Sequence, residues 1–431
     1  MSKAVCIIVE NGCVPPDTRV WREAVTLAEA GYGVSVICPK RPGFERSYEV
    51  LKGVEIYRHD SLDASRPLGY LFEYAWAFLI ELLLAVRIYA RTRFSVLQAC
   101  NPPDTIFLIA LFFRFLGVRF VFDQHDPTPE FYEARFQRRD FLYQVIRIAE
   151  RLTFNAADVT IVTNESCREI ALTRGSVPED RCFVVRSCPD LDEVRSGVPR
   201  PELLGDKELL VVYVGIMGPQ DGLNLLLQSI HHIVKVVGKT NVQFALVGPG
   251  SEVEHLKTKA AQLGIESWVN FTGPLYGEPL YSYFASADIG VSPDPANAFN
   301  DKLTMVKILE YMAYGLPVVL YDLQEGRRSA EGAALFAKPN EPIDFAQKIV
   351  RLMDAEPLRK ELGSVGKRRV ETTLNWEIEK RTYLRAYETA FGGRAPKRPR
   401  AGKKNLKTAA TPAAGALFVS NPSDSRETVS N

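Results

Sequence analysis

Apolar runs separated by helical patterns recur along the first half of the chain. The opening has an apolar run at 5–9, a loop rich in glycine and proline at 11–17, a helical pattern at 19–30 and a second apolar run at 34–38. Strands that are apolar along their whole length are typical of parallel sheets that helices cover on both faces. The alternation continues with apolar runs at 95–99, 119–123, 159–163 and 182–186. The pattern predicts an α/β domain built on a parallel sheet.

This alternation stops near residue 187 and restarts near residue 210. The sequence between, SCPDLDEVRSGVPRPELLGDKE, is rich in proline, glycine and charge. We therefore predict an α/β fold of two facing Rossmann-like domains, 1–200 and 201–375, with a cleft between them. A helix at 376–391 is predicted to cross back onto the first domain. Residues 392–431 hold too few apolar residues to fold alone and are predicted to be disordered.

The segment at 70–89, YLFEYAWAFLIELLLAVRIY, approaches the roughly 20 apolar residues that span a bilayer. Glu73, Glu81 and Arg87 interrupt it. A charge near the centre of a membrane helix costs roughly 3 kcal/mol. We therefore predict a helix packed on the first sheet, with a membrane-surface helix and a membrane-spanning helix as the alternatives.

Composition narrows the function classes. Hydrophobic residues make up 46% of the chain and charged residues 24%, which is typical of a globular protein. The formal net charge of +1 argues against nucleic acid as the partner. The predicted tail alone carries +6, with eight Lys and Arg against Asp424 and Glu427, which leaves about −5 for the rest.

Cysteine usage and the N-terminus indicate a cytoplasmic protein. The seven cysteines are odd in number and form no C-x-x-C pair, so we expect a reducing compartment and no structural zinc. The chain runs directly into VCIIVE without the features of a secretory signal.

The stretch at 300–322, NDKLTMVKILEYMAYGLPVVLYD, is the most informative of the chain. It predicts a helix that begins close to Leu303 or Thr304, whose free N–H groups would form a phosphate site with Lys302 and Lys307. Glu310, two turns along, is placed to accept two ribose hydroxyls. The alternative is that Glu310 and Lys307 are an exposed, weak helical pair.

The pattern E-Y-M-A-x-G-x-P-V-V in this stretch resembles the donor-binding segment of family 4 glycosyltransferases of the GT-B type. Further similar pieces are PPDTRVWREAVTLAEAGYGVSVI, VVYVGIMGPQDGLNLLLQSI, FALVGPGSEVEHL and VNFTGPL, in this order, and the resemblance covers 3–391. It implies an acceptor-side first domain and a donor domain that binds a nucleoside-diphosphate sugar. It also implies transfer to a hydroxyl with retention, without a metal ion or other cofactor, in polysaccharide or glycolipid assembly.

Departures from the family pattern fall at the donor site. Many members carry two glutamates separated by seven residues, but here Lys302 occupies the first position and Glu310 the second. Many also carry an arginine and a lysine in the first turn of the second domain, where this chain has Ile216 or Met217 and Asp221. The candidate donor-binding residues implied by the resemblance are therefore Gly215, Met217, Gly218, Lys302, Leu303, Thr304, Lys307 and Arg327 or Arg328, with Arg328 preferred.

Four residues of the first domain are predicted to face the cleft. His125 and Asp126 follow a strand, at the sheet edge where ligands bind in doubly wound folds. The resemblance implies that His125 lies by the donor sugar, and a structural histidine is the alternative. Asp17 and Arg19 follow the first strand, although Asp17 is equally suited to cap the next helix.

Three other functions remain open. A dinucleotide oxidoreductase would need G-x-G-x-x-G after an opening strand, and neither ENGCVPPD nor GIMGPQDG fits. A catalytically silent nucleotide-sugar-binding scaffold is suggested by Lys302 and the missing arginine. A sugar-nucleotide epimerase shares the fold, which by itself does not decide function.

The partners that we expect are a nucleotide-sugar donor, a saccharide or lipid-linked saccharide acceptor, and an anionic membrane surface. Five arginines at 135–151 alternate with apolar residues, and the tail is also basic. We therefore predict salt-sensitive peripheral association with the inner face of the cell membrane. The alternative is that these apolar residues all face the core. The arginines are Arg135, Arg138, Arg139, Arg147 and Arg151, and the apolar residues are Phe136, Phe141, Leu142, Tyr143 and Ile146.

Overall fold

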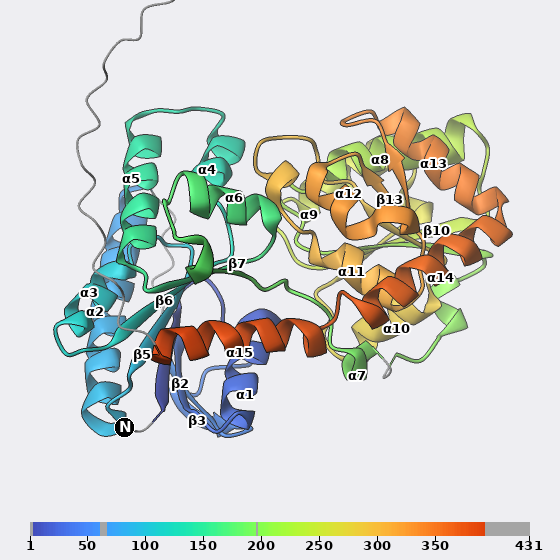
Figure 1. Cartoon of the computed structure of the whole chain (residues 1–431). Helices are drawn as coiled ribbons and strands as arrows, with labels where there is room; N and C mark the ends of the chain where they lie inside the picture. Colours follow the sequence, from blue (N-terminus) through green and yellow to red (C-terminus); the bar gives the residue numbers. More distant parts are fainter. Residues whose placement is uncertain (1–2, 61–66, 195–196, 393–431) are drawn as a thin grey trace, which may run out of the picture. The chain divides into compact units, whose positions relative to one another are not determined.

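The computed structural model describes residues 3–60, 67–194 and 197–392, and Figure 1 shows how their helices and strands are arranged. The predicted basic tail after Gly392 lies outside the described residues. Two sheets of mostly parallel strands organise the described part of the chain. This confirms the predicted α/β class with two Rossmann-like sheets.

The first sheet has eight strands in the order β3-β4-β2-β1-β5-β6-β7-β8. Its neighbouring strands are parallel except for β3, which pairs antiparallel with β4. Strand order reverses at β1, because β2 pairs with one of its edges and β5 with the other. The strands are β1 (Ala4–Val9), β2 (Gly33–Pro39), β3 (Tyr48–Leu51), β4 (Val54–His59), β5 (Val96–Cys100), β6 (Arg119–Gln124), β7 (Val159–Val162) and β8 (Cys182–Val184).

The second sheet has six strands in the order β11-β10-β9-β12-β13-β14, and its neighbours are all parallel. Here the order reverses at β9. The strands are β9 (Leu209–Val214), β10 (Val242–Val247), β11 (Val269–Gly273), β12 (Ile289–Ser292), β13 (Val318–Tyr321) and β14 (Ala334–Ala337).

Helices connect the strands of both sheets. With the first sheet are α1 (Thr18–Glu29), α2 (Pro67–Thr92), α3 (Phe107–Arg114), α4 (Thr128–Phe136), α5 (Phe141–Ala156), α6 (Glu165–Thr173) and α7 (Leu191–Val194). With the second are α8 (Leu223–His231), α9 (Val253–Gln262), α10 (Glu278–Ser286), α11 (Val306–Ala313), α12 (Gln324–Ala330), α13 (Pro342–Asp354) and α14 (Glu356–Thr372). The last helix, α15 (Trp376–Gly392), returns to the first sheet.

Continuous apolar strands are buried here on both sides, as their sequence predicts. All six residues of β1 are buried, and successive side chains enter different cores because strand side chains alternate between faces. Ile7 packs in the core that includes residues of α1 and α15, and Ile8 packs in the core that includes residues of α2 and α3. The first sheet is therefore the middle layer of a three-layer domain.

Helix α2 packs against β1, β2 and β4, as predicted for the apolar segment at 70–89. Glu81, one of the charges in this segment, is 1% exposed, and its Oε1 lies 3.8 Å from Nε2 of His59. No helix in the described part of the chain is both long enough and apolar enough to cross a membrane.

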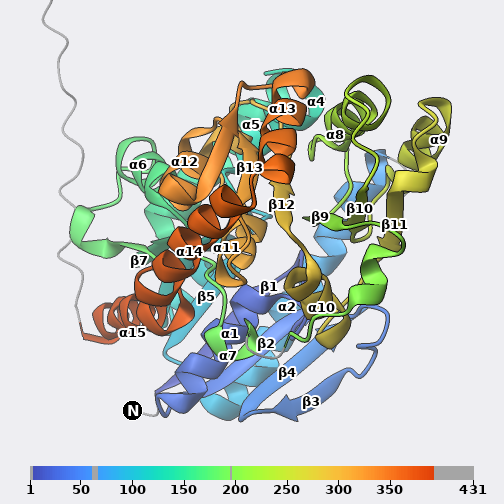
Figure 2. The same ribbon diagram turned by 90° about the vertical axis from the view of Figure 1, so that its right-hand side faces the viewer.

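The last helix, α15, lies against the first sheet although it follows the second in sequence (Figures 1 and 2). Trp376 Nε1 donates a hydrogen bond to Thr26 Oγ1 of α1 at 3.0 Å. The hydroxyls of Tyr383 and Tyr387 donate to Gln98 Oε1 of β5 at 2.9 and 2.6 Å. The crossover helix thus completes the first domain's core.

Candidate active site

A cavity of about 350 Å³ lies where loops after β1, β6 and β7 meet the loop that precedes α11. The carboxyl ends of parallel strands, at the point where strand order reverses, are where ligands bind in open α/β sheets. A hollow of about 720 Å³ is larger, but helices α1 and α15 supply much of its lining. The smaller cavity is therefore the better candidate for the active site, because it lies at the carboxyl ends of strands. It is lined by Pro16, Asp17, Thr18, Arg19, His125, Asp126, Thr163, Ser187, Leu303, Thr304 and Val306.

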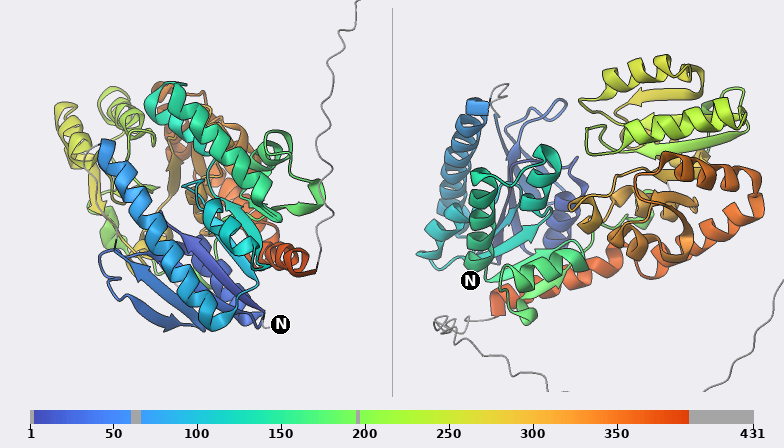
Figure 3. Two further views of the ribbon diagram at one scale, coloured as in Figure 1. Left: turned by 90° about the vertical axis from the view of Figure 1, so that its left-hand side faces the viewer. Right: turned by 90° about the horizontal axis from the view of Figure 1, so that it is seen from above.

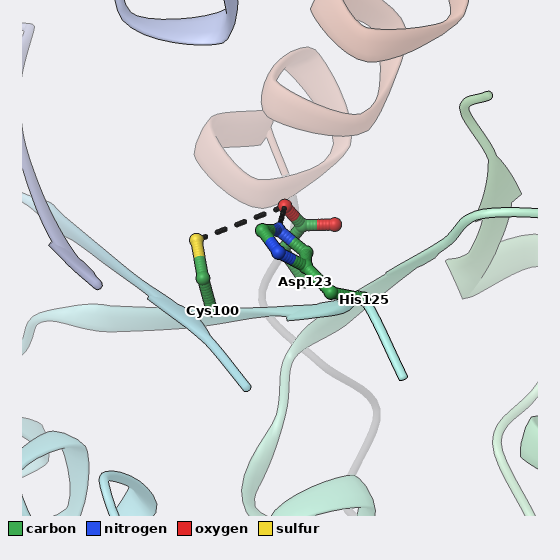
Figure 4. A group of neighbouring side chains, drawn as sticks. All are labelled: Cys100, Asp123 and His125. Carbon is green, nitrogen blue, oxygen red and sulfur yellow. Dashed lines mark hydrogen bonds and ion pairs between the residues drawn. The ribbon is translucent and has the colours of Figure 1, made fainter. Parts of the chain in front are cut away.

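His125 and Asp123 form a hydrogen-bonded pair at the end of β6 (Figure 4). The distance from His125 Nε2 to Asp123 Oδ2 is 2.8 Å. Burial by itself would lower the pKa of His125, but the charge of Asp123 and this hydrogen bond outweigh burial, so the pKa is raised. Asp123 therefore stabilises the imidazolium form of His125 relative to the neutral form.

Arg19 holds Asp123 from the other side. Burial opposes the charged form of Asp123, but Arg19 and His125 outweigh it and hold the pKa of this carboxyl well below its usual range. Arg19 Nη2 lies 2.6 Å from Asp123 Oδ1, and Arg19 Nη1 donates to the carbonyl oxygen of Val185 at 2.8 Å. Arg19 borders the cavity as predicted, but its guanidinium is bonded to buried partners. It is therefore placed to position the dyad.

The same network reaches the crossover helix. Gln98 Nε2 donates to Glu23 Oε2 at 2.7 Å, while Gln98 Oε1 accepts from the two tyrosines of α15. Burial, with Asp123 nearby, raises the pKa of Glu23 to about 8. Sequence reasoning missed Gln98 and Glu23, because each lies inside an ordinary strand or helix pattern.

Asn101 fixes the loop that carries His125 and Asp126. Its Oδ1 accepts from the backbone N–H groups of both residues, at 2.7 and 3.3 Å. Its Nδ2 donates to the carbonyl oxygen of Asp126 at 2.8 Å. Burial raises the pKa of Asp126. An asparagine directly after an apolar strand was the available sequence signal for Asn101.

Asp17 caps helix α1, which was the predicted alternative to contact with a ligand. Its Oδ1 accepts from the backbone N–H of Val20 at 3.1 Å and so caps α1. Asp17 also lines the cavity, so capping leaves it at the site.

Lys307 lies in the first turn of α11. Its Nζ contacts both oxygens of Asp294, at 2.9 and 3.1 Å, and lies 4.8 Å from the ring centroid of Tyr213. Asp294 is 3% exposed and accepts a hydrogen bond from Ser292. Asp294 was not predicted, because nothing in the sequence indicates its proximity to Lys307. Glu310 lies one turn further along α11 and is half-buried.

The loop before α11 differs from the prediction. Residues Asn300–Lys302 form a separate 3-10 turn, and α11 begins at Val306 rather than near Leu303 or Thr304. Lys302 Nζ donates to the carbonyl oxygen of Ala298 at 3.3 Å. Leu303 and Thr304 line the cavity from the extended segment between the two helices.

The turn after β9 contributes backbone more than side chains. Met217 is fully buried, so its side chain faces the core of the second domain. The N–H of Gly218 already donates to Asp221 Oδ2 at 2.8 Å. At Gly248 an added Cβ would lie 1.9 Å from the carbonyl oxygen of Gly215, so this turn and the end of β10 pack backbone against backbone.

Arg328 lies at a contact between the two domains and is absent from the cavity lining. Its Nη1 lies 2.5 Å from Glu325 Oε1 and 3.3 Å from Ser166 Oγ. Glu325 also accepts from the hydroxyl of Ser166 at 2.6 Å. Arg327 pairs with Asp322 instead. To bind a diphosphate as predicted, Arg328 would therefore have to leave Glu325, which neutralises it here.

A second contact between the domains lies at the first residues of α6. Asn164 caps α6, and its Nδ2 donates to the carbonyl oxygen of Lys302 at 2.8 Å and to Thr304 Oγ1 at 3.2 Å. This asparagine links the first domain directly to the loop that lines the cavity.

Among the residues that the structure describes, one group of side chains has the spacing of metal ligands. Ligand atoms of Cys100, Asp123 and His125 lie within 4.8 Å of one another. Burial, with Asp123 nearby, raises the pKa of the Cys100 thiol, which keeps it protonated and a poor ligand. Arg19 already neutralises Asp123, so a divalent cation would meet a positive neighbour. We interpret the group as part of the dyad's hydrogen-bond network (Figure 4).

The model of Glycosyltransferase Family 4 matches residues 17–193, and that of Glycosyl transferases group 1 matches residues 208–355. An uncharacterised glycosyltransferase of Methanocaldococcus jannaschii is 22% identical, over 85% of this chain and 92% of that protein.

Two solved structures share the fold. Sucrose-phosphate synthase from Thermosynechococcus elongatus superposes with a TM-score of 0.75 at 17% identity, covering 90% of this chain and 99% of that one. The Anabaena protein HepE, in complex with UDP and glucose, gives 0.66 at 14% identity, covering 90% and 100%. With a match on each side of the cavity, the chain belongs to the family 4 glycosyltransferases of the GT-B type.

Proposed function

We propose that this glycosyltransferase moves a sugar from a nucleoside-diphosphate sugar to a hydroxyl acceptor, with retention of the anomeric configuration. The observation that carries the proposal is the shared cavity: His125 of the first domain and the loop before α11 of the second line the same space. A donor whose diphosphate lies at the start of α11 has its sugar directed toward His125. The UDP and glucose complex of HepE supports a donor of this class.

Three features of α11 suit a nucleoside diphosphate. The first-turn N–H groups and the positive end of the helix attract phosphate. Lys307 adds a cationic group, which the buried Asp294 holds in a fixed direction and partly neutralises. Glu310, one turn further along, is at a suitable spacing for the ribose hydroxyls. Lys302 adds positive potential near the cavity, while Arg328 contributes less because Glu325 neutralises it.

The proposed chemistry takes place on one face of the sugar. The bond from the anomeric carbon to the diphosphate breaks, and its electron pair goes to the diphosphate oxygen. The acceptor oxygen forms the new bond on that same face, and its proton passes to the departing phosphate. The protein then acts mainly by stabilising charge on the diphosphate, through Lys307 and the amides of α11.

On the first domain, Asp123 orients His125 by fixing one ring nitrogen. The other ring nitrogen is then available to a sugar hydroxyl. Asp17 and Asp126 are the carboxylates that line the cavity, and we assign them to the acceptor side. We propose that the reaction needs no metal ion, because Lys307 and the α11 amides supply the positive charge; activity in the presence of EDTA tests this.

We further propose that the acceptor is a saccharide or a lipid-linked saccharide and that the product belongs to a polysaccharide or glycolipid. The enzyme would then work in the cytoplasm, at the inner face of the cell membrane.

A thermal-shift screen of UDP-, GDP- and ADP-sugars tests the donor assignment. A ligand at 100 times its Kd stabilises the folded state by about 2.7 kcal/mol. We expect one nucleotide class to raise Tm in the wild type and to do so less in Glu310→Ala. No shift with any nucleotide sugar would contradict the proposal. Binding without transfer would instead indicate a silent scaffold, and sugar isomerisation without acceptor an epimerase.

A further inference from the structure

Exposed apolar residues gather on three helices of the first domain. Of the 22 large apolar residues that are exposed in the described part of the chain, 13 lie on or directly after α2, α3 and α5. We call these 13 residues the three-helix face. They are Trp76, Leu79, Leu83 and Val86; Leu108, Phe112, Phe115 and Leu116; and Phe141, Leu142, Val145, Ile148 and Leu152.

The three helices are neighbours on the outside of the first sheet. Helices α3 and α5 are in contact, and the ring of Tyr89 on α2 lies 5.4 Å from that of Phe113 on α3. In the left view of Figure 3, α2, α3 and α5 lie side by side toward the viewer, in blue, cyan and green. Their solvent sides therefore form one continuous region of the surface.

Each helix is apolar on two opposite sides. On α2, the exposed residues recur at helical spacing, at 76, 79, 83 and 86, while Ala77, Ala85 and Ile88 are buried. On α5, exposed residues recur at 141, 145, 148 and 152, while Tyr143 and Phe154 are buried. A surface helix of a globular protein normally has a polar outer side, and a helix that is apolar all round is typically surrounded by protein or lipid. An apolar outer side on three adjacent helices indicates a docking surface.

Acidic residues of these helices are buried, and basic residues are exposed, in the part of the chain that the structure describes. Among their described side chains, both acidic residues are buried: Glu81 is 1% exposed, and Glu150 is fully buried and paired with Arg174. The exposed charges of the described part of α2, α3 and α5 are all arginines, namely Arg87, Arg91, Arg114, Arg147 and Arg151. Arg91 pairs with Glu55 of β4, and Arg114 lies 3.6 Å from Asp158. The outer surface of the three helices is thus apolar and cationic.

We propose that the three-helix face docks onto an anionic lipid bilayer. The apolar side chains would enter the headgroup region, and the arginines around them would bind lipid phosphates. A second copy of this chain fits less well, because a symmetric dimer brings the same patch of each copy together and so opposes arginine to arginine. Docking does not depend on the proposed transfer reaction, since no residue of the face lines the cavity.

This surface differs from the basic stretch that the sequence indicated. Arg138 pairs with Asp140 at 2.9 Å, and Arg139 pairs with Glu133 of α4 at 2.7 Å, so neighbouring carboxylates partly neutralise these two arginines. The predicted alternative, that the interleaved apolar residues all face the core, holds for Tyr143 but not for Phe136, Phe141 and Leu142, which are exposed. Helices α2 and α3 were not part of the sequence-based surface.

Flotation of the full chain with vesicles tests the proposal. One set of vesicles consists of phosphatidylcholine alone. The other contains about 30% phosphatidylglycerol in phosphatidylcholine, which makes its surface anionic. The test variant is Leu83→Gln/Phe112→Gln/Ile148→Gln, whose residues are 60%, 49% and 59% exposed. The matched control is Val236→Gln/Tyr276→Gln/Ile343→Gln in the second domain, at 64%, 71% and 54% exposed.

We expect the wild type and the control to float with anionic vesicles. The test variant should lose at least about tenfold in partitioning, because polar side chains replace three apolar ones that would enter the headgroup region. Arg87→Gln/Arg147→Gln/Arg151→Gln should bind several-fold less at low salt and show a weaker salt dependence. A variant with Lys403, Lys404 and Lys407 changed to Gln should still float, because the face remains.

Three results would overturn the proposal. The first is a test variant that floats as well as the control. The second is flotation that depends on the tail lysines and not on the face. The third is a wild-type dimer by light scattering that the test variant abolishes, without vesicle binding. Because the vesicles contain no sugar nucleotide, each result is independent of whether the enzyme transfers sugar.

Discussion

At the scale of single residues, the site depends on side chains whose charges are fixed by buried partners. His125 is held by Asp123, and Lys307 is held by Asp294. His125, Lys307 and Glu310 could be named from the sequence, because their types and positions after a strand or in a helix are informative. His125 lines the cavity, whereas Lys307 and Glu310 lie on α11 and are not among the lining residues. Asp294 could not be named from the sequence, since its pairing with Lys307 arises only in the folded domain. For Asn101 the one available signal was its position directly after an apolar strand.

The titration of His125 is the first prediction. Its pKa is raised above the value of about 6.5 expected in the unfolded chain. Its protonation therefore stabilises the folded state fully below pH 6.5, and this contribution is lost as the pH rises through the folded-state pKa. We expect Asp123→Asn to lower the pKa of His125, as followed by NMR of the ring protons. An unchanged or higher pKa in the folded variant would show that Asp123 is not the cause.

Lys307→Ala is predicted to weaken binding of nucleoside diphosphate by about 10- to 100-fold, the loss of one charged hydrogen bond, and binding of the nucleoside much less. Calorimetric titration with both ligands measures this. Removing Lys307 also leaves the buried Asp294 unpaired, so Lys307→Ala/Asp294→Asn serves as the control for stability. Equal losses for the two ligands would contradict a phosphate role.

Glu310→Ala is predicted to lower kcat/KM for transfer by about 10- to 100-fold for each hydrogen bond lost, with the fold intact. A charged hydrogen bond of the proposed kind contributes roughly 1.5 to 3 kcal/mol. The wild type should bind a nucleoside diphosphate more tightly than its 2′,3′-dideoxy analogue, and the variant should bind the two equally. If the variant still prefers the ribose form, the hydroxyls are bound elsewhere.

At the scale of elements, the apolar runs predict nearly all strands that border the site, because buried parallel strands need continuous apolar sequence. Element ends are less predictable. The helix expected near Leu303 begins at Val306, since a 3-10 turn takes up residues Asn300–Lys302 and an extended segment follows it. Propensity along the chain does not reveal that Asn164 holds this segment from the other domain.

The crossover helix gives an element-scale prediction. Tyr387→Phe removes a hydrogen bond to Gln98 but keeps the ring, so we expect a loss of about 1 kcal/mol in the free energy of unfolding. Tyr387→Ala should cost about 3 to 5 kcal/mol, because this side chain is fully buried. Urea unfolding measures both, with the exposed Tyr276→Phe as control. Equal costs for the two changes at Tyr387 would mean that packing of its ring contributes little.

At the scale of the whole molecule, the sequence predicts two similar sheets but not the contacts between the domains. Ser166 bonded to Glu325 and Phe131 packed at 5.1 Å on Phe299 join segments more than 150 residues apart. The 350 Å³ cavity exists only because these contacts bring His125 opposite the loop before α11. Which side of α2 is exposed could likewise not be predicted, because apolar residues occupy both its core side and its exposed side.

The most direct test of the account compares the anomeric configuration of the transferred sugar in the donor and in the product. With the donor from the thermal-shift screen and a saccharide or lipid-linked saccharide acceptor, NMR coupling constants report the configuration of the new glycosidic bond and of the donor. The account predicts release of nucleoside diphosphate and a product with the same anomeric configuration as the donor. An inverted product, or an altered sugar nucleotide formed without acceptor, would contradict it.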